Sequence, residues 1–267
     1  MAEYTVLSPQ TCIISSRAKI GKGAVIYPNN VLLGACVIGA GAVLYPGNIL
    51  EDSAVGAGAR VTASVLTGAQ VGAGAHVGPF AHLRPGAQVG QDCRVGSFVE
   101  VKASRLGRGV RAGHLAYIGD ADVGAHTNIG CGAVFCNYDG AQKYRARVGE
   151  NCFIGSNVNL IAPLRVGDGC YIAAGTTVTG DLPPGSFAAG RARARVVPDQ
   201  KGLYRPRGGP SDPAQNAPAA DREAPGCGRC ACGGEGSCGR CACGGEGSCG
   251  QCACGRCGGA PGEGADD

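Results

Sequence analysis

Aliphatic residues recur at every sixth position over most of the first 180 residues, and this period constrains the fold more than any other feature. Three runs follow it: Ile20, Ile26, Leu32, Ile38, Leu44 and Leu50; Val65, Val71, Val77, Leu83, Val89, Val95 and Val101; and Val148, Ile154, Leu160, Val166, Ile172 and Val178. Neither an α-helix nor a simple alternating strand sustains a period of six. A hexad suits a short strand and a tight turn repeated around a prism, with the aliphatic side chain pointing inward. The sequence therefore predicts an all-β chain folded as a parallel β-helix, with three hexads in each coil.

The period is broken at a few places, and these breaks predict where the prism is irregular. The spacing shortens to five between Leu50 and Val55, between Val101 and Leu106, and between Ile118 and Val123. It opens to thirteen between Phe135 and Val148, where the stretch CNYDGAQKYRA exceeds one hexad. We expect this stretch to loop out of the prism, and loops on rigid scaffolds often carry chemistry.

The composition divides the chain into three regions. Residues 1–197 carry the repeat, and residues 198–226 are rich in Pro, Gly, Ala and charge, as is typical of a flexible linker. Residues 227–267 form a Cys-rich low-complexity tail, which we expect to be disordered. Seven of the 17 cysteines lie in the first region and ten in the tail, so the two regions differ in their chemistry.

The net charge and the N-terminal residues indicate which binding partners and which cellular compartment to expect. A formal net charge of +4 gives little reason to expect binding to nucleic acid or to a membrane surface. No apolar run reaches the roughly 18–20 residues that span a bilayer, and the start MAEYTVLSPQ lacks the basic and apolar regions of a secretory signal. We therefore expect a cytoplasmic protein without a membrane span, whose thiols stay free or bind metal.

Polar residues intrude on the repeat between residues 84 and 156. Arg84 and Lys102 are eighteen apart, so we expect them to lie one above the other as a cationic pair without an obvious acidic partner, which suits a phosphate. His114 can accept a proton near neutral pH, and Glu100 is expected to orient it. For any one of these residues the alternative is a solvated side chain on the outside of the prism. Their clustering near irregular spacing favours a site.

Several stretches resemble one enzyme family. They are VGPFAHLRPGA (77–87), VGSFVEVKASRLGRG (95–109), AGHLAYIGDADVG (112–124), CNYDG (136–140), FIGSNVNLIAP (153–163) and AAGTTVTGDL (173–182). Together they resemble the acetyltransferase half of the bifunctional N-acetylglucosamine-1-phosphate uridyltransferase/glucosamine-1-phosphate acetyltransferase family, over roughly residues 5–197. The resemblance implies a left-handed parallel β-helix and a homotrimer with active sites between subunits. It also implies acetyl transfer from acetyl-CoA to the amine of glucosamine 1-phosphate, for UDP-N-acetylglucosamine and cell-envelope peptidoglycan synthesis.

The resemblance also assigns roles by position. His114 matches the general base. The residues expected to be catalytic are His114, Glu100 and Asn137. The residues that match the sugar-phosphate contacts are Arg84, Lys102, Tyr117, Asn128 and Lys143. The residues that match the acetyl-CoA contacts are Asn137, Tyr138, Ser156, Ala174 and Arg191, with Cys131 in place of an alanine.

Part of the family pattern has no counterpart here. No Gly-rich nucleotide loop or α/β region precedes the repeats, so we expect no uridyltransferase activity from this chain. Uridyl transfer would then fall to a separate uridyltransferase.

The Cys-rich tail repeats a unit of eleven residues. CGRCACGGEGS (227–237) recurs at 238–248 and, altered, as CGQCACGRCGG (249–259). Closely spaced thiolates can chelate a soft metal ion. A metal-free low-complexity expansion is an equal alternative, and a disulfide framework is a third. The ten candidate ligands are Cys227, Cys230, Cys232, Cys238, Cys241, Cys243, Cys249, Cys252, Cys254 and Cys257.

Other functions stay open beside the favoured one. One alternative is a hexapeptide-repeat acyltransferase with another amino-sugar acceptor, since the sequence does not fix the acceptor. A carbonic-anhydrase-like zinc protein would need three ligand histidines at a subunit interface, and the chain has His76, His82, His114 and His126. A trimeric scaffold that carries a metal-binding tail would need no chemistry on the prism.

Overall fold

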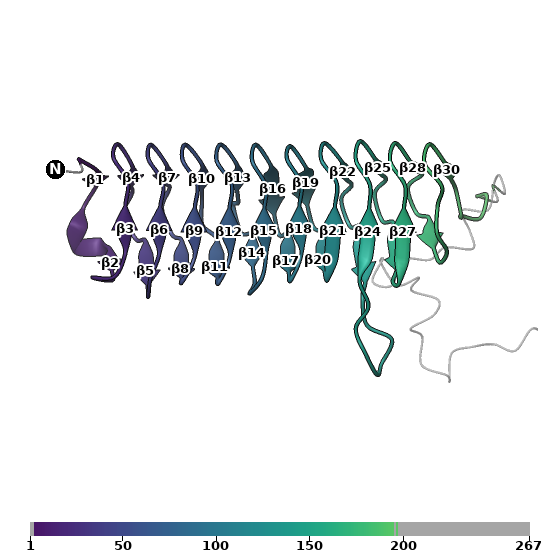
Figure 1. Ribbon diagram of the computed structural model, residues 1–267, viewed down its shortest axis with the longest axis horizontal. Helices are drawn as coiled ribbons and strands as arrows, with labels where there is room; N and C mark the ends of the chain where they lie inside the picture. Colours follow the sequence, from purple (N-terminus) through teal and green to yellow (C-terminus); the bar gives the residue numbers. More distant parts are fainter. Residues whose placement is uncertain (1–2, 195, 197–267) are drawn as a thin grey trace, which may run out of the picture. The chain divides into compact units, whose positions relative to one another are not determined.

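The computed structural model describes residues 3–194 and 196, which form a parallel β-helix (Figure 1). Its short strands build three parallel sheets of 11, 10 and 9 strands, which confirms the predicted all-β coil. A single 3-10 turn, η1 (Pro9–Thr11), is the one helical element in this part of the chain, and no helix there is long and apolar enough to cross a bilayer. The predicted linker and the ten tail cysteines lie outside the described residues.

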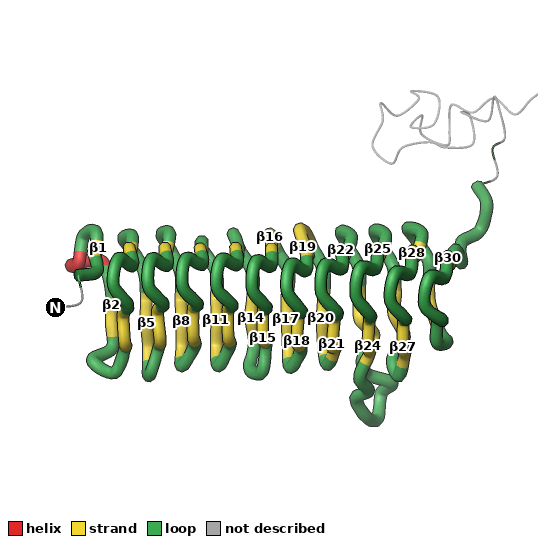
Figure 2. The backbone as a smooth tube through the Cα atoms, turned by 45° about the horizontal axis from the view of Figure 1, so that its top comes forward, coloured by secondary structure: helices red, strands yellow, loops and turns green. Residues whose placement is uncertain are grey.

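Each full coil contributes one strand to each sheet, and we name the sheets A, B and C in the order in which the chain visits them (Figure 2). Sheet A holds β1 (Thr5–Val6), β4 (Val25–Ile26), β7 (Val43–Leu44), β10 (Arg60–Val61), β13 (His76–Val77), β16 (Arg94–Ser97), β19 (Arg111–His114), β22 (Asn128–Ile129), β25 (Phe153–Ile154), β28 (Tyr171–Ile172) and β30 (Phe187–Ala188). Sheet B holds β2 (Ile13–Ile14), β5 (Val31–Leu33), β8 (Ile49–Glu51), β11 (Val65–Thr67), β14 (His82–Leu83), β17 (Glu100–Lys102), β20 (Tyr117–Gly119), β23 (Val134–Cys136), β26 (Asn159–Ile161) and β29 (Thr177–Val178). Sheet C holds β3 (Lys19–Ile20), β6 (Val37–Ile38), β9 (Ala54–Val55), β12 (Gln70–Val71), β15 (Gln88–Val89), β18 (Arg105–Leu106), β21 (Ala121–Val123), β24 (Ala146–Val148) and β27 (Leu164–Val166).

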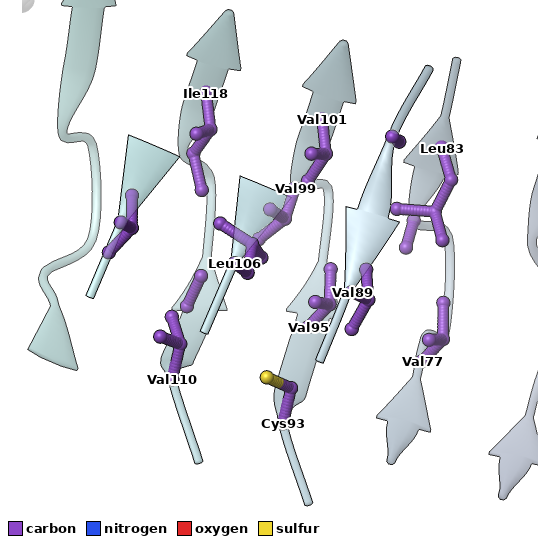
Figure 3. Packing of buried hydrophobic residues seen from close by; sticks show 14 of the residues in the cluster. Val77, Leu83, Val89, Cys93, Val95, Val99, Val101, Leu106, Val110 and Ile118 are labelled. Carbon is purple, nitrogen blue, oxygen red and sulfur yellow. The ribbon is translucent and has the colours of Figure 1, made fainter. Parts of the chain in front are cut away.

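The inward side chains form one apolar core along the prism. Figure 3 shows residues of neighbouring coils, such as Leu83 and Val101, turned toward the same interior. The aliphatic residues that recur at every sixth position are buried as expected, with two exceptions. Ile20, in the first run, is only partly buried, and Val65 is 38% exposed because its neighbour Leu66 points inward instead. The cause at Val65 is a shorter turn at Ala63, which shifts the inward position by one residue.

Each of the three predicted short spacings contains one non-glycine residue in the left-handed backbone region. Asp52, Ala103 and Asp120 have φ of +43°, +45° and +48°, and each stands at the turn that joins a sheet B strand to the next sheet C strand. We call these turns the B–C corner, and name the A–B and C–A corners in the same way. At these turns the chain passes from sheet B to sheet C with inward positions five residues apart, where some other coils use six.

Glycine at the A–B corner allows successive coils to touch at the backbone. A Cβ at Gly130 would lie 2.5 Å from the carbonyl carbon of Gly155, and a Cβ at Gly155 would lie 2.5 Å from the backbone nitrogen of Ala174. Any side chain at these two positions would force neighbouring coils apart, so these two turns require glycine.

The long interval in the repeat is a loop, as predicted. Residues 137–145 leave the prism after β23 and return to it at β24, where Figure 1 shows a projection from the otherwise regular coil. The loop therefore presents its side chains beside sheet B, at the B–C corner.

Candidate active site

Sheet B and the corners that border it carry most of the residues predicted to form a site. Glu100 and Tyr117 are paired neighbours on the outer face of sheet B. Arg84 and Lys102 stand one coil apart at the start of the B–C corner, because β14 and β17 pair in register. The structure thus brings these four residues together, as the eighteen-residue spacing predicts for the two cations.

Each of the two cations has an acidic partner. Arg84 Nη1 donates a hydrogen bond to Glu100 Oε1 at 2.8 Å, and Lys102 Nζ lies 3.1 Å from Asp120 Oδ2. The expectation of a cationic pair without an acidic partner is therefore wrong, because the side chains of the following coil reach back to both cations. Each cation keeps further N–H donors, since a guanidinium carries five and an ammonium three. The pairs hold the cations in place and leave donors for an anion.

The imidazole of His114 lies at the end of β19, where sheet A turns into sheet B. Its side chain is exposed and forms no hydrogen bond with any residue between 3 and 194. Glu100, expected to orient it, instead accepts from Arg84. The structure thus corrects the partner of Glu100 and leaves His114 open to a ligand.

Asp120 is a member of this cluster that the sequence analysis does not single out. Its Oδ2 accepts hydrogen bonds from Lys102 and, at 2.5 Å, from Asn137 Nδ2. Burial acts to raise the pKa of Asp120, but these hydrogen bonds and the charges of Lys102 and Lys143 outweigh it, so the pKa lies below its ordinary value. Asp120 is therefore ionised at neutral pH. The five-residue break in which it lies is the sequence signal that marks it.

The loop 137–145 is a small hairpin fixed at its base. Tyr138 and Lys143 form an antiparallel bridge, and Asp139 accepts from the backbone of Ala141 and Gln142 at 2.8 and 2.7 Å. Tyr138 is 59% exposed and Lys143 is also exposed. The hairpin thus presents an aromatic and a cationic side chain at the border of sheet B.

Arg145 fixes the end of this hairpin to the prism. Its Nε and Nη2 donate to the two oxygens of Asp122 at 2.7 Å each, and its Nη1 donates to the carbonyl of Ala103 at 3.1 Å. The hydrogen bond from Arg145 is the main cause that lowers the pKa of Asp122, so this pair is ionised at neutral pH.

Replacing Arg145 by methionine is expected to loosen the hairpin without unfolding the prism. Because the ion pair is partly exposed to solvent, we expect the amides of residues 138–144 to exchange faster by a factor of only about 2 to 5. Hydrogen-exchange mass spectrometry measures this. Arg147→Met, on the outer face of β24, is the matched control, and equal loosening by both variants would contradict the anchoring role of Arg145.

Three of the residues matched to acetyl-CoA form a strip along the A–B corner, whereas Asn137 and Tyr138 lie at the B–C corner. Cys131, Ser156 and Ala174 occupy equivalent turn positions in successive coils, tied by hydrogen bonds from Asn157 N to Cys131 O and from Gly175 N to Ser156 O, both 2.8 Å. All three are exposed, and Arg191 donates to the carbonyl of Ala174 at 3.3 Å. In register His114 precedes Cys131 in the same column, so the imidazole lies one coil from this strip.

Asn128 does not join the sheet B cluster. It lies on β22 and pairs with Arg111 and Phe153, so it belongs to sheet A, a different side of the prism. Within one chain the structure therefore separates Asn128 from the other residues matched to the sugar phosphate.

The histidines of the zinc alternative are also spread over the prism. His76 belongs to sheet A, His82 to sheet B, and His126 to the C–A corner. Across residues 3–194 no group of three His, Cys, Asp or Glu side chains is arranged to hold a metal ion. The tail cysteines lie beyond the residues to which this observation applies.

Comparison with known proteins relates the prism to one group of enzymes. The family described as Bacterial transferase hexapeptide (six repeats) matches residues 68–103 and 145–180. The Bifunctional protein GlmU of Geobacillus thermodenitrificans is 45% identical over 189 residues, which are 71% of this chain and 41% of that protein. The Bifunctional protein GlmU of Clostridium beijerinckii is 43% identical over 204 residues, which are 75% and 45%. This chain spans less than half the length of these curated relatives.

Among solved structures, the UDP-N-acetylglucosamine acyltransferase from Campylobacter jejuni is similar with a TM-score of 0.48 at 16% identity, covering 69% of this chain and 71% of that chain. The hexapeptide match, the parallel β-helix that the repeats form and the identity with the GlmU proteins agree with one another. Residues 68–103 and 145–180 thus carry the repeats of the bacterial transferase hexapeptide family.

Proposed function

We propose that the chain transfers an acetyl group from acetyl-CoA to the amine of glucosamine 1-phosphate, which gives N-acetylglucosamine 1-phosphate for UDP-N-acetylglucosamine synthesis. The observation that carries this proposal is the arrangement of Arg84 and Lys102 one coil apart at one edge of sheet B, whose other edge carries the exposed imidazole of His114. The 45% identity to a GlmU protein over this same region supports it.

The chemistry needs only a base and correct placement of two substrates. The amine nitrogen of the sugar attacks the thioester carbonyl carbon, the new C–N bond forms, and the C–S bond breaks. The proton that the nitrogen loses passes to His114 and then to the leaving thiolate of CoA. Because a thioester is already activated, no covalent enzyme intermediate is required, and alignment supplies much of the acceleration.

The sheet B cluster suits the phosphate of the acceptor. Arg84 and Lys102 each keep N–H donors that their carboxylate partners do not use, and Lys143 reaches the same region from the hairpin. A phosphate oxygen bound there accepts charge-assisted hydrogen bonds, which are stronger than neutral ones.

The exposed strip of the A–B corner suits acetyl-CoA. Its small residues leave the backbone open along three coils, and Arg191 adds a cation at the far end for a phosphate of the cofactor. Cys131 places a free thiol on this strip, one coil from His114.

A homotrimer would complete the site. Asn128 is matched to the sugar phosphate but lies on sheet A, whereas the cations lie on sheet B. A second copy that turns its sheet A toward sheet B of the first would bring Asn128 to the phosphate. Sedimentation velocity tests the assembly, and a monomer with full activity would overturn this part of the proposal.

We place the reaction in the cytoplasm, where acetyl-CoA and sugar phosphates are available and thiols stay reduced. No partner beyond the small-molecule substrates and further copies of the chain is required for it.

The test offers glucosamine 1-phosphate, glucosamine 6-phosphate and glucosamine in parallel, each with acetyl-CoA. Product is measured by mass spectrometry, because the 17 thiols of the chain would interfere with a thiol-release assay. Turnover of the 1-phosphate alone is expected. Turnover of another acceptor would move the proposal to that amino sugar. Absence of turnover with all three would overturn it and favour a scaffold that carries the cysteine tail.

A further inference from the structure

The backbone of Asp120 is held by hydrogen bonds to the coils on both sides of it. Its N–H donates to the carbonyl of Lys102 at 3.0 Å, and its own carbonyl accepts from Ala146 N at 3.1 Å. The residue has a φ of +48°, which aspartate, asparagine and glycine adopt more readily than other residues. The side chain therefore leaves the B–C corner in a direction that the neighbouring coils determine.

This carboxylate joins three successive coils. Lys102 Nζ from the preceding coil lies 3.1 Å from Oδ2 and 3.5 Å from Oδ1, and Asn137 Nδ2 from the following coil lies 2.5 Å from Oδ2. The Lys102–Asp120 pair is the more sheltered of the two ion pairs in the cluster, with each side chain 19% exposed, against 41% and 37% for Arg84 and Glu100. Shelter from water strengthens its hydrogen bonds.

The hydrogen bond to Asn137 determines which way its amide faces. An ionised carboxylate only accepts hydrogen bonds, so the NH2 group of Asn137 must face Asp120. The carbonyl oxygen Oδ1 is then left to accept a hydrogen bond on the opposite side of the amide. If Asp120 could also donate, either orientation of the amide would be possible.

Side chains of the cluster occupy the space above Gly119. A Cβ at Gly119 would overlap the hydroxyl of Tyr117 and would lie 2.8 Å from Asn137 Nδ2. The tip of the Tyr117 ring and the Asn137 amide therefore fill the volume that a side chain would take. Lys102, Tyr117 and Asn137 thus converge next to Asp120.

We propose that Asp120 is a positioning residue: it holds the Lys102 ammonium where the phosphate of the acceptor binds and fixes the Asn137 amide with its oxygen toward the substrates. This inference rests on the proposed function, and it assigns Asp120 no contact with either substrate. Its effect on catalysis passes through Lys102 and Asn137.

The test compares Asp120→Asn with Asp92→Asn in the full chain. Asp92 is also left-handed, at φ +57°, and also forms an ion pair, with Arg108 of the next coil at 3.2 Å, but it lies at the C–A corner. The two variants therefore lose the same charge from the same kind of turn. For Asp120→Asn we expect the KM for glucosamine 1-phosphate to rise about tenfold or more, with a melting temperature close to that of Asp92→Asn. For Asp92→Asn we expect wild-type kinetics.

A double variant shows whether Asp120 acts through Lys102. Asp120→Asn added to Lys102→Met is expected to raise the KM no further than Lys102→Met alone, since residues that act as a unit are not additive. Asp120→Gly, which suits the left-handed φ and removes the carboxylate, is expected to repeat the effect if the asparagine variant folds poorly. A wild-type KM in Asp120→Asn, or full additivity with Lys102→Met, would overturn the proposal.

If the proposed function itself is wrong, the kinetic result differs from those described for the variants. In that case the wild-type chain itself turns over no glucosamine 1-phosphate. Calorimetric binding of glucosamine 1-phosphate to the wild type, Asp92→Asn and Asp120→Asn then decides the inference. Weaker binding by Asp120→Asn alone supports it, and equal binding or no binding by all three overturns it.

Discussion

Replacing His114 by asparagine is expected to lower kcat for acetyl transfer by about 100- to 10,000-fold, the usual contribution of a general base. An amide cannot take a proton from the attacking amine near neutral pH, whereas an imidazole can. Since the side chain is exposed and forms no hydrogen bond within residues 3–194, its loss removes no structural contact there. The melting temperature and the KM for acetyl-CoA are therefore expected to stay close to those of the wild type. Initial-rate kinetics with product detection by mass spectrometry measures both constants.

His126→Asn is the matched control for this variant. His126 is an exposed histidine at the C–A corner with a φ of +58°, a conformation that asparagine adopts readily. It is expected to leave kcat within twofold of the wild type. Near-normal turnover in His114→Asn would remove His114 from the mechanism, and equal losses in both variants would indicate a general disturbance of the prism.

Replacing Phe135 by alanine is expected to lower the free energy of unfolding by about 3–5 kcal/mol, as for other buried phenylalanines. Phe135 lies on β23, is fully buried and is the largest such side chain in the described chain. Its cavity cannot collapse easily, because coils that touch at Gly130 and Gly155 cannot move closer. The melting temperature is expected to fall by about 6–20 °C for a domain of this size, which circular dichroism measures.

Phe187→Ala serves as the control for the core variant. Phe187 is 69% exposed and stacks on Tyr171 with ring centroids 5.7 Å apart at the end of an outer aromatic column. Its loss is expected to cost no more than about 1.5 kcal/mol. Equal destabilisation by the two variants would mean that burial on β23 is not what stabilises this part of the prism.

The sequence predicts the fold well because burial repeats with the coil. An inward aliphatic at every sixth residue leaves few structures possible, and the thirteen-residue gap predicts that the chain loops out of the prism there, as residues 137–145 do. The misassigned Val65 shows the limit of this reasoning. Val65 and Leu66 are both aliphatic, and only the left-handed turn at Ala63 decides which of them points inward.

The site is harder to predict, because spacing fixes the column in which a residue stands but not the direction of its side chain. The eighteen-residue interval correctly brings Arg84 and Lys102 together, yet it does not show that Glu100 and Asp120 turn back toward them. Asn128 illustrates a second limit. The sequence stretches that resemble one family assign Asn128 a role at the sugar phosphate, but they do not indicate that it lies on sheet A.

Because the strands pair in register, equivalent residues of successive coils stand at fixed intervals along the prism axis. Residues that follow one another in a column are separated by one strand spacing, about 4.8 Å. A functional group can therefore move along the axis only in whole steps, as Lys102 stands one step from Arg84. Adapting such a site to a longer or shorter acceptor requires changes in side-chain length or in the corners. Extra residues within a strand would shift the following inward residues out of the core, whereas extra residues that loop out at a corner, as 137–145 do, leave the later coils in place.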